Sequence, residues 1–449
     1  MATPRSTQRL RWLLTHVASG PSPTSENRNI NGDDEWGVLK TTAITWDGWD
    51  WQQHKVLPQQ YWGIKAAEVK AGDILVTKAG PRNRVGVSVY VDHSPSRLVA
   101  SGKMLLLRPD RMVTDPRFLS WILGTPSSQS YLDARKTGMA ESQMNFTNND
   151  LLGMSLDIPT LDEQRRIADY LESATLQIGR LLAARKKQQQ LVRERQSLLL
   201  TGATSGAVRI ERNKSDGIID GRRPQGEERS RIARGVLAAE APADWEIVPL
   251  RRIMQKLSRK VAPTDSVITA YRDGTVTLRS QRREEGYTFS DLEQGYQGVD
   301  PGDLVFHALD GFAGAVGVSD ARGKSSPVYH VCSMRADDDP QFMAYALRAM
   351  GLTGYLALQA GNVRQRSVDF RPWESLARIT MPRPPVKTQR AISAHLTSAR
   401  IWTDEVLNAI DRQTRLLAER RQALITAAVT GQFDVSTASG RNVSEGLQV

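Results

Sequence analysis

Apolar positions in two long stretches of the chain recur in alternating steps of four and three residues. The first stretch shows this spacing at Ile167, Leu171, Ala174, Ile178 and Leu181. After one irregular interval the same spacing continues, but some of its positions hold polar residues. Heptad-like spacing with such polar interruptions is typical of a coiled-coil interface rather than of a helix in a globular core. The pattern predicts a helix from a cap at Asp162 to about Leu200. About 40 residues at 1.5 Å each give a rod of roughly 60 Å.

The same pattern occurs again 225 residues further along the chain. Segments 159–206 and 384–431 align without a gap and are identical at 17 of 48 positions, where chance would give about three. One apolar stripe cannot bury itself, so the repeat predicts that the two helices pair, with separate burial in two domains as the alternative. The residues expected to pair the helices or dock a partner are Gln164, Ile167, Leu171, Ala174, Ile178, Leu181, Leu191, Gln389, Ile392, Leu396, Ala399, Val406 and Leu416.

Before each helix, short apolar runs alternate with turn signals, which predicts a mixed α/β domain. The second domain echoes the first: Val69-x-x-Gly72-Asp73 recurs as Val299-x-x-Gly302-Asp303, and Arg108 recurs as Arg335. The framework repeats while most loop and surface residues differ. The predicted order is an α/β domain at 1–157, a helical region at 158–206, a charged linker at 207–243, a second α/β domain at 244–380, a second helical region at 381–435 and a disordered tail at 436–449.

Charge and composition narrow the class of protein. Lys and Arg total 60 against 49 Asp and Glu, a net charge of +11, which favours an anionic partner such as nucleic acid. The single Cys332 gives no disulfide framework and no thiolate zinc site. No apolar run approaches 18 residues and no signal-peptide core is present. We therefore expect a soluble protein in the cytoplasm.

Catalytic motifs are largely missing from the sequence. No Gly-x-Gly occurs, and six scattered histidines have no metal-ligand spacing. Asp50 with Glu68 and Lys70 fits a loose nuclease pattern, but the second domain has Gly298 and Asp300 at the equivalent places. We expect no catalytic residue, no metal site and no cofactor bound by this chain.

Basic and amide side chains gather in loops of both domains. Arg recognises guanine edges, Asn or Gln recognises adenine, and Lys mostly contacts phosphate. A single such loop is more often an ordinary solvated surface, and it is the recurrence in both domains that favours DNA binding. The candidate DNA-binding residues are Lys78, Arg82, Asn83, Arg84, Arg135, Lys136, Gln143 and Asn145 in the first domain, and Arg279, Gln281, Arg282, Arg283, Arg322, Lys324, Asn362, Arg364, Gln365 and Arg366 in the second.

One run carries a resemblance to a known family. Ile158-Pro159-x-x-x-Glu163-Gln164-x-x-Ile167-Ala168-x-x-Leu171, followed by a long helix and a closing Gly206, resembles the specificity subunit of type I restriction-modification systems. The order domain, helix, domain, helix also matches, so the resemblance covers nearly the whole chain. The chain departs from the pattern at Thr388, which stands where the first copy has Glu163, and in its longer linker.

The resemblance implies a fold and a function. In that family, two target-recognition domains each read half of a bipartite, asymmetric double-stranded DNA site, and the two helices pair antiparallel as a spacer. The helices also dock two methyltransferase subunits, which bring S-adenosylmethionine, and restriction subunits bring ATP and Mg. Three alternatives remain open: a modification-only or fused system, a stand-alone nuclease using Glu68 and Lys70, and a coiled-coil adaptor without a DNA role.

Overall fold

The computed structural model describes residues 5–208 apart from positions 25, 33 and 47, and residues 241–282, 295–359, 363–364, 367–432 and 435. The chain forms two compact units. The first consists of Met1–Arg185 with Arg412–Val449, and the second of Lys186–Asp411. Most of the predicted linker and the whole predicted tail lie outside the described residues.

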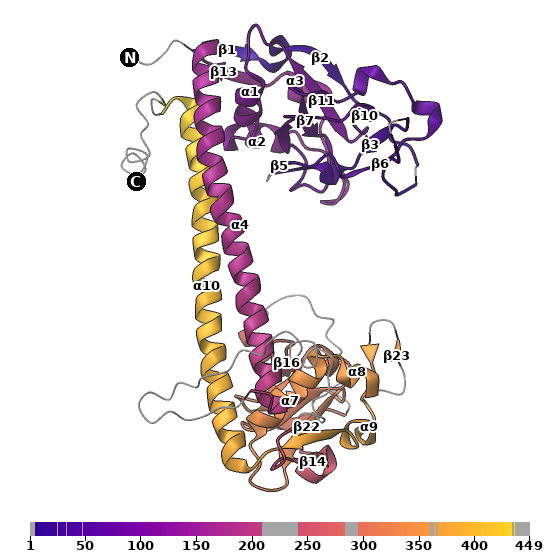
Figure 1. Ribbon diagram of the computed structural model, residues 1–449, viewed down its shortest axis with the longest axis vertical. Helices are drawn as coiled ribbons and strands as arrows, with labels where there is room; N and C mark the ends of the chain where they lie inside the picture. The colour runs from indigo at the N-terminus through magenta and orange to yellow at the C-terminus, as the bar shows by residue number, and fades with distance from the viewer. Residues whose placement is uncertain are drawn as a thin grey trace. The chain divides into compact units, whose positions relative to one another are not determined.

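The two predicted helices are present as α4 (Leu161–Ser205) and α10 (Val386–Thr430) (Figure 1). Each ends at a glycine with positive φ, Gly206 at 83° and Gly431 at 73°, a backbone conformation that glycine adopts without steric cost and that ends helices. The predicted cap at Asp162 is wrong. The helix begins at Leu161, one residue before Asp162, and the backbone N–H of Gln164 donates to the Thr160 carbonyl at 2.9 Å. Asp162 lies in the first turn, where its charge suits the helix dipole.

The first unit is built around a four-stranded antiparallel sheet of order β2-β11-β7-β9. Successive residues of β11 face opposite sides: Leu105 and Leu107 join one buried cluster, and Met104 and Leu106 join another. Both faces of this strand are therefore buried. The strands and neighbouring helices are β2 (Leu14–Ala18), β7 (Ile74–Thr77), β9 (Ser88–Tyr90), β11 (Met104–Pro109), α1 (Pro116–Leu123), α2 (Pro126–Asp133) and α3 (Asn148–Leu152).

The second unit repeats this framework. Its central sheet has the equivalent order β15-β22-β19-β20, again antiparallel. The corresponding elements are β15 (Met254–Lys256), β19 (Leu304–His307), β20 (Val316–Val318), β22 (Tyr329–Met334), α7 (Pro340–Leu352), α8 (Tyr355–Gln359) and α9 (Trp373–Ala377). The predicted mixed α/β class with two tandem domains is confirmed.

A two-stranded ladder leads into each long helix. In the first unit β1 (Ser6–Arg9) pairs with β13 (Ser155–Ile158), and in the second β14 (Glu246–Pro249) pairs with β25 (Thr380–Arg383). A short helical turn, η1 (Leu10–Leu13) or α6 (Leu250–Ile253), follows the first strand of each ladder. The last residue of β13 or β25 comes just before the proline that precedes the helix, so the ladder fixes where each helix starts.

The units differ in the elements added to this framework. The first has a sheet of order β10-β3-β6 and the pairs β12–β8 and β4–β5, and the second has the pairs β16–β17, β18–β21 and β23–β24. Bounds in the first unit are β3 (Gly37–Leu39), η2 (Thr41–Ala43), β4 (Ile44–Thr45), β5 (Gly48–Trp49), β6 (His54–Val56), η3 (Gln59–Tyr61), η4 (Lys65–Ala67), β8 (Ala79–Gly80), β10 (Leu98–Val99) and β12 (Met144–Asn145). Those in the second are β16 (Ile268–Ala270), β17 (Val276–Leu278), η5 (Arg279–Gln281), β18 (Gln297–Val299), η6 (Gly311–Ala313), β21 (Gly323–Ser325), β23 (Val363–Arg364) and β24 (Ser367–Val368).

The helices contribute to the core of each unit as well as to each other. In the first unit, Ile167 and Leu171 of α4 share one buried cluster with Leu424 and Ala428 of α10 and with the domain's own core. In the second, Leu200 and Ala203 of α4 share a cluster with Ile392 and Leu396 of α10. In both, the start of one helix meets the end of the other, which is antiparallel pairing. Two contacts between the helices agree with this direction. Gln189 of α4 donates to Asp411 of α10, and further along α4 the Arg195 guanidinium lies 5.4 Å from the ring centroid of Trp402, which comes earlier in α10.

The buried stripe differs from the predicted spacing by one position at Leu181. Leu181 is 51% exposed, whereas Leu182 packs against the core of the first unit. Leu191 and Leu416, also predicted for pairing, are half-exposed. Partner docking by these three leucines stays a prediction.

Candidate nucleic-acid interface and the joints that position it

Three candidate DNA-binding residues of the first unit meet at one groove of about 500 Å³. Arg82, Asn83 and Lys136 line it together with the 45% exposed Trp46. Arg82 pairs with Glu141 at 2.9 Å. The Lys136 ammonium pairs with Asp133 and donates to the Arg82 carbonyl at 3.1 Å, so it braces the loop with little exposed surface. The groove combines an exposed ring with a guanidinium and an amide, the groups that stack on and recognise bases.

The remaining candidates of the first unit do not all face solvent. Arg84 turns inward and donates to the carbonyls of Thr41 and Ile44 at 2.6 and 3.2 Å, so it holds that turn. Arg135 lies over the Tyr131 ring at 3.6 Å and is exposed. Gln143 and Asn145 are exposed, and Lys78 is half-buried. Arg84 is therefore placed for a structural role, and Arg135, Gln143 and Asn145 remain accessible.

In the second unit the candidates gather beside the β16–β17 hairpin. The Arg279 Nε donates to the Thr269 hydroxyl at 3.3 Å, and the Thr277 hydroxyl donates to the Gln281 side chain at 2.7 Å. Arg282 pairs with Asp273 and lies 4.6 Å from the Tyr271 ring centroid. These contacts fix the side chains of Arg279, Gln281 and Arg282, which all come from one short segment.

Other candidates of the second unit lie elsewhere or cannot be described. Arg322 pairs with Asp265 at 3.3 Å and with Asp300 at 3.2 Å, and Lys324 belongs to β21. Arg364 is described as part of β23 without its side chain. Four predicted residues lie outside the described residues: Arg283, Asn362, Gln365 and Arg366.

Two arginines missed by the sequence reasoning lie close to the same hairpin. Arg348 of α7 and Arg400 of α10 line a cavity of about 200 Å³ with Asp273 and Gln341. The Nε–H groups of both arginines are buried and have no acceptor within the described part of the chain. Burial, reinforced by the charge of Arg400, lowers the pKa of Arg348 and outweighs the opposing effect of Asp273. Each arginine sits in a helical stretch, and no loop signal marks it in the sequence.

The residues of the alternative nuclease reading have local structural partners. Glu68 accepts a hydrogen bond from the Arg97 amide at 3.1 Å, and Asp50 accepts one from the Gln52 amide at 3.0 Å. No group of three or more His, Cys, Asp or Glu side chains able to hold a metal ion occurs in the described ranges. Cys332 is buried, and this burial raises the pKa of its thiol to about 12.

The Gly-Asp turn has the same backbone conformation in both units, but its aspartate pairs with a different arginine in each. Gly72 and Gly302 have φ of 96° and 90°, the left-handed region that glycine tolerates. Asp73, buried after the turn, accepts two 2.8 Å hydrogen bonds from Arg108. Asp303 instead pairs with Arg259.

Arg335, the sequence counterpart of Arg108, has a different partner. Its Nε donates to the Arg251 carbonyl at 2.9 Å. The buried aspartate of the Gly-Asp turn is thus paired with an arginine in both units, although the two arginines come from different segments. Position in the repeat alone did not reveal the partner.

Each long helix is joined to its domain through a buried glutamine in its first turns. The Gln164 Oε1 accepts from the Thr114 hydroxyl and the Asp115 amide, both at 2.9 Å, and its Nε2 donates to the carbonyls of Pro159 and Val113 at 3.0 and 3.3 Å. The Gln389 Oε1 accepts from the Asp339 amide at 2.9 Å. Gln164 and Gln389, predicted for helix pairing or partner docking, contact their own domains, and partner docking by them stays a prediction.

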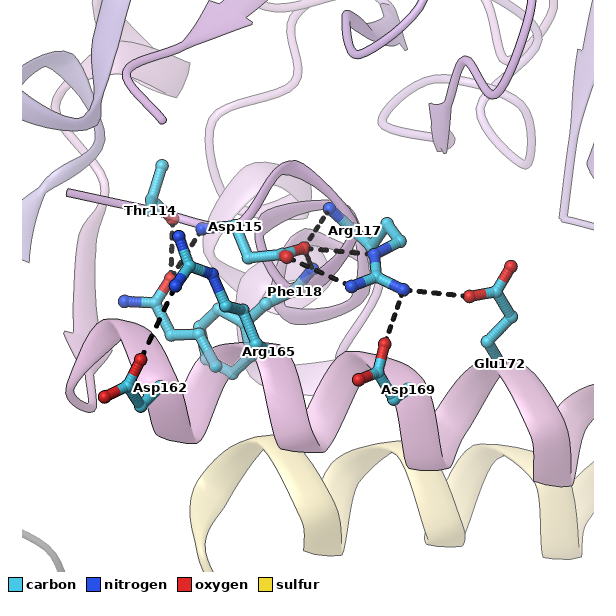
Figure 2. Close-up of polar contacts among 9 residues, drawn as sticks. Thr114, Asp115, Arg117, Phe118, Asp162, Arg165, Asp169 and Glu172 are labelled. Atoms are coloured by element: carbon cyan, nitrogen blue, oxygen red, sulfur yellow. Dashed lines mark hydrogen bonds and ion pairs between the residues drawn. The ribbon is translucent and has the colours of Figure 1, made fainter. Parts of the chain in front are cut away.

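A different ion pair reinforces each joint. In the first, Arg117 of α1 pairs with Asp115 and reaches Asp169 and Glu172 of α4 at 2.7 and 3.0 Å (Figure 2). Burial opposes the charge of Arg117, but the hydrogen bonds that it donates to these carboxylates raise its pKa. In the second joint, the fully buried Asp338 accepts two 2.9 Å hydrogen bonds from Arg383. These bonds raise the pKa of Arg383.

Comparison with solved structures identifies the fold. One chain in a structure describing complex assembly and conformational transition of the type I R-M system aligns with a TM-score of 0.65 at 16% identity, covering 96% of this chain and 99% of that one. The doubled domain-and-helix arrangement is therefore a fold found in type I restriction-modification assemblies. No protein-family model matches the sequence.

Sequence comparison gives more particular relatives. The chain is 35% identical over 164 residues to the type I restriction enzyme EcoEI specificity subunit of Escherichia coli, a match covering 36% of this chain and 28% of that subunit. It is 20% identical over 379 residues to the putative type I restriction enzyme MjaX specificity subunit of Methanocaldococcus jannaschii, covering 82% and 79%. The resemblance to type I specificity subunits is confirmed. Within the described residues, no helix has the length and apolar character needed to cross a membrane.

Proposed function

We propose that this chain is the DNA sequence-specificity subunit of a type I restriction-modification complex. It recognises a bipartite, asymmetric site in double-stranded DNA and is the scaffold for methyltransferase and restriction subunits. The observation that carries the proposal is one framework built twice, each copy joined to a long helix in the same way, with different side chains around the loops. The likeness to specificity subunits supports the same function.

The two candidate interfaces differ in the groups that they offer. The first unit presents Trp46, Arg82 and Asn83 around its groove, whereas the second presents Arg279 and Arg282 beside a hairpin. Side chains of different kind and placement select different base edges. Each unit therefore reads its own half-site, and the whole site has no two-fold symmetry.

The chemistry is assigned to the partner subunits. This chain binds no cofactor in the proposal, and S-adenosylmethionine, ATP and Mg belong to the methyltransferase and restriction subunits. Glu68 and Asp50, the acidic groups of the nuclease alternative, are engaged by backbone amides at 3.1 and 3.0 Å. The net charge of +11 suits a subunit that holds DNA phosphates while others react.

The deciding experiment is modified-base sequencing of the host genome with and without this gene. Loss of one split, asymmetric methyl-adenine motif on deletion is the expected result. An unchanged pattern of modified bases, together with purified protein whose duplex affinity does not fall with salt, would refute DNA recognition because phosphate contacts release counterions.

Half-specific variants sharpen the test. Replacing Arg82 and Asn83 by Ala should relax or abolish the first half of the motif and leave the second half intact. Arg282→Ala should do the reverse. Arg371→Ala is a matched control, because this exposed arginine pairs with Asp369, two positions away in sequence. A motif altered in both halves by either recognition variant would contradict the division of labour.

A further inference from the structure

We infer that Gln164 and Gln389 are positioning residues that fix each recognition domain on its long helix and so set how strictly the distance between half-sites is read. This inference rests on the proposed function. It assigns to two buried amides a role in spacing, separate from the side chains that read bases.

The first joint uses the whole hydrogen-bonding capacity of its amide. Gln164 is 1% exposed, and its side-chain oxygen accepts two bonds while its nitrogen donates two. An amide has two acceptor sites and two donors, so all are filled. Asp115, bound through its backbone amide, also caps α1 by accepting from the Arg117 and Phe118 amides at 2.9 and 3.2 Å. One side chain thus ties the start of α4 to the start of α1.

The second joint repeats this arrangement on different neighbours. Gln389 is fully buried, and its Nε2 donates to the Pro384 carbonyl and to the Asp338 carboxylate, both at 2.8 Å. Its Oε1 partner, the Asp339 amide, belongs to the residue that caps α7 by accepting from the Gln341 amide at 3.0 Å. Both glutamines therefore tie the start of a long helix to the capped start of a domain helix.

The surroundings of the two glutamines differ while the amide is the same. Thr114 in the first joint corresponds to Asp338 in the second, and Ile158 corresponds to Arg383. The ion pair differs accordingly, since Arg117 serves one joint and Arg383 the other. If the joint only had to bury surface, an apolar residue of similar size would serve. An amide with three or four directed hydrogen bonds instead fixes an angle.

The length of the helix makes this angle important. A 45-residue helix is roughly 67 Å long at 1.5 Å per residue, so a tilt of about 3° at one end displaces the other end by roughly 3.5 Å. That displacement equals about one base-pair step of duplex DNA. A joint that loses its directed bonds therefore blurs the spacing by about one base pair, without changing any base contact.

The test uses the complete complex with its modification subunits and a DNA library in which the two half-sites are separated by every spacer length near the natural one. Gln164→Met and Gln389→Met keep the volume and burial of the side chain and remove its directed bonds. Methylation at the natural spacer is divided by methylation at spacers one base pair shorter and longer. We expect this ratio to fall by about tenfold in each variant, which is less than the full contribution of the three or four lost hydrogen bonds, with both half-motifs unchanged.

Arg165→Ala is the matched control. This neighbour of Gln164 is half-exposed and forms an ion pair with Asp162 in its own helix at 3.5 Å, also drawn in Figure 2. It should keep the ratio of the unaltered chain. A purely structural role for the glutamines predicts equal loss of methylation at all spacers, which would overturn the inference. Thermal unfolding of each variant separates loss of folded protein from loss of discrimination. Failure of the proposed function itself would be distinct, because the unaltered chain would then direct no split motif.

Discussion

The buried ion pair of the second joint allows a prediction from the repeat itself. Replacing Arg383 by Ile leaves the fully buried Asp338 carboxylate with the Gln389 amide as its remaining side-chain donor. Adding Asp338→Thr should restore stability, because the first unit has the neutral residues Thr114 and Ile158 at these two places and its glutamine is still fully hydrogen-bonded. The single variant should be strongly destabilised and the double variant close to the unaltered chain.

The magnitude follows from the charge left behind. Two charge-assisted hydrogen bonds of 2.9 Å are lost, and removing one partner of a buried pair typically costs about 3–5 kcal/mol. Replacing both partners by neutral residues is often close to neutral, so the double variant should lie within about 1 kcal/mol of the starting stability. For a unit of this size, about 1 kcal/mol shifts the melting temperature by about 2–4 °C, which predicts a fall of about 6–20 °C for the single variant.

The measurement is native-state hydrogen exchange of the full chain, read on peptides of β22 and α7, together with thermal unfolding. Exchange reports the second unit separately, which matters because a two-unit chain need not unfold in one step. Arg117→Met is the control in the first joint. Its partners Asp169 and Glu172 are about two-thirds exposed, and Asp115 keeps two amide donors, so the cost should be nearer 1 kcal/mol. A double variant as unstable as Arg383→Ile would refute the reasoning that the neutral pair of the first joint can replace the ion pair of the second.

Two further predictions concern backbone and pH. Gly302→Ala should destabilise the second unit by about 1–2 kcal/mol, because the φ of Gly302 is 90°. Gly179→Ala should instead stabilise α4 by about 0.5–1 kcal/mol, because an added methyl group there meets open space. Urea midpoints that move in the same direction for both variants would contradict this. Burial lowers the pKa of His330, so its protonation favours the unfolded state. The stability that its neutral form contributes is present above the unfolded-state pKa of about 6.5 and falls as pH drops below it. His330→Gln should reduce the difference between urea midpoints at neutral and mildly acidic pH, and an unchanged difference would exclude this histidine as its source.

Features that depend on local spacing along the chain are predictable without the structure. The doubled helix, its end at Gly206 and Gly431, and the Gly-Asp turns follow from apolar period and from backbone conformations that few residues adopt. The α/β character of both domains follows from short apolar runs between turn residues. These signals act over a few positions, so they can be read without knowing what packs against them.

Contacts between groups that are distant in sequence follow only from the folded structure. Nothing near Gln164 in sequence indicates Thr114, and the repeat pointed to Arg335 where Arg259 pairs with Asp303. Arg348 and Arg400 meet at one cavity from two helices. The strand pairing and the packing of helices on the sheet set these contacts, and both depend on segments tens to hundreds of residues apart. A side chain's own position in the pattern fixes its element, and only the fold fixes its partner.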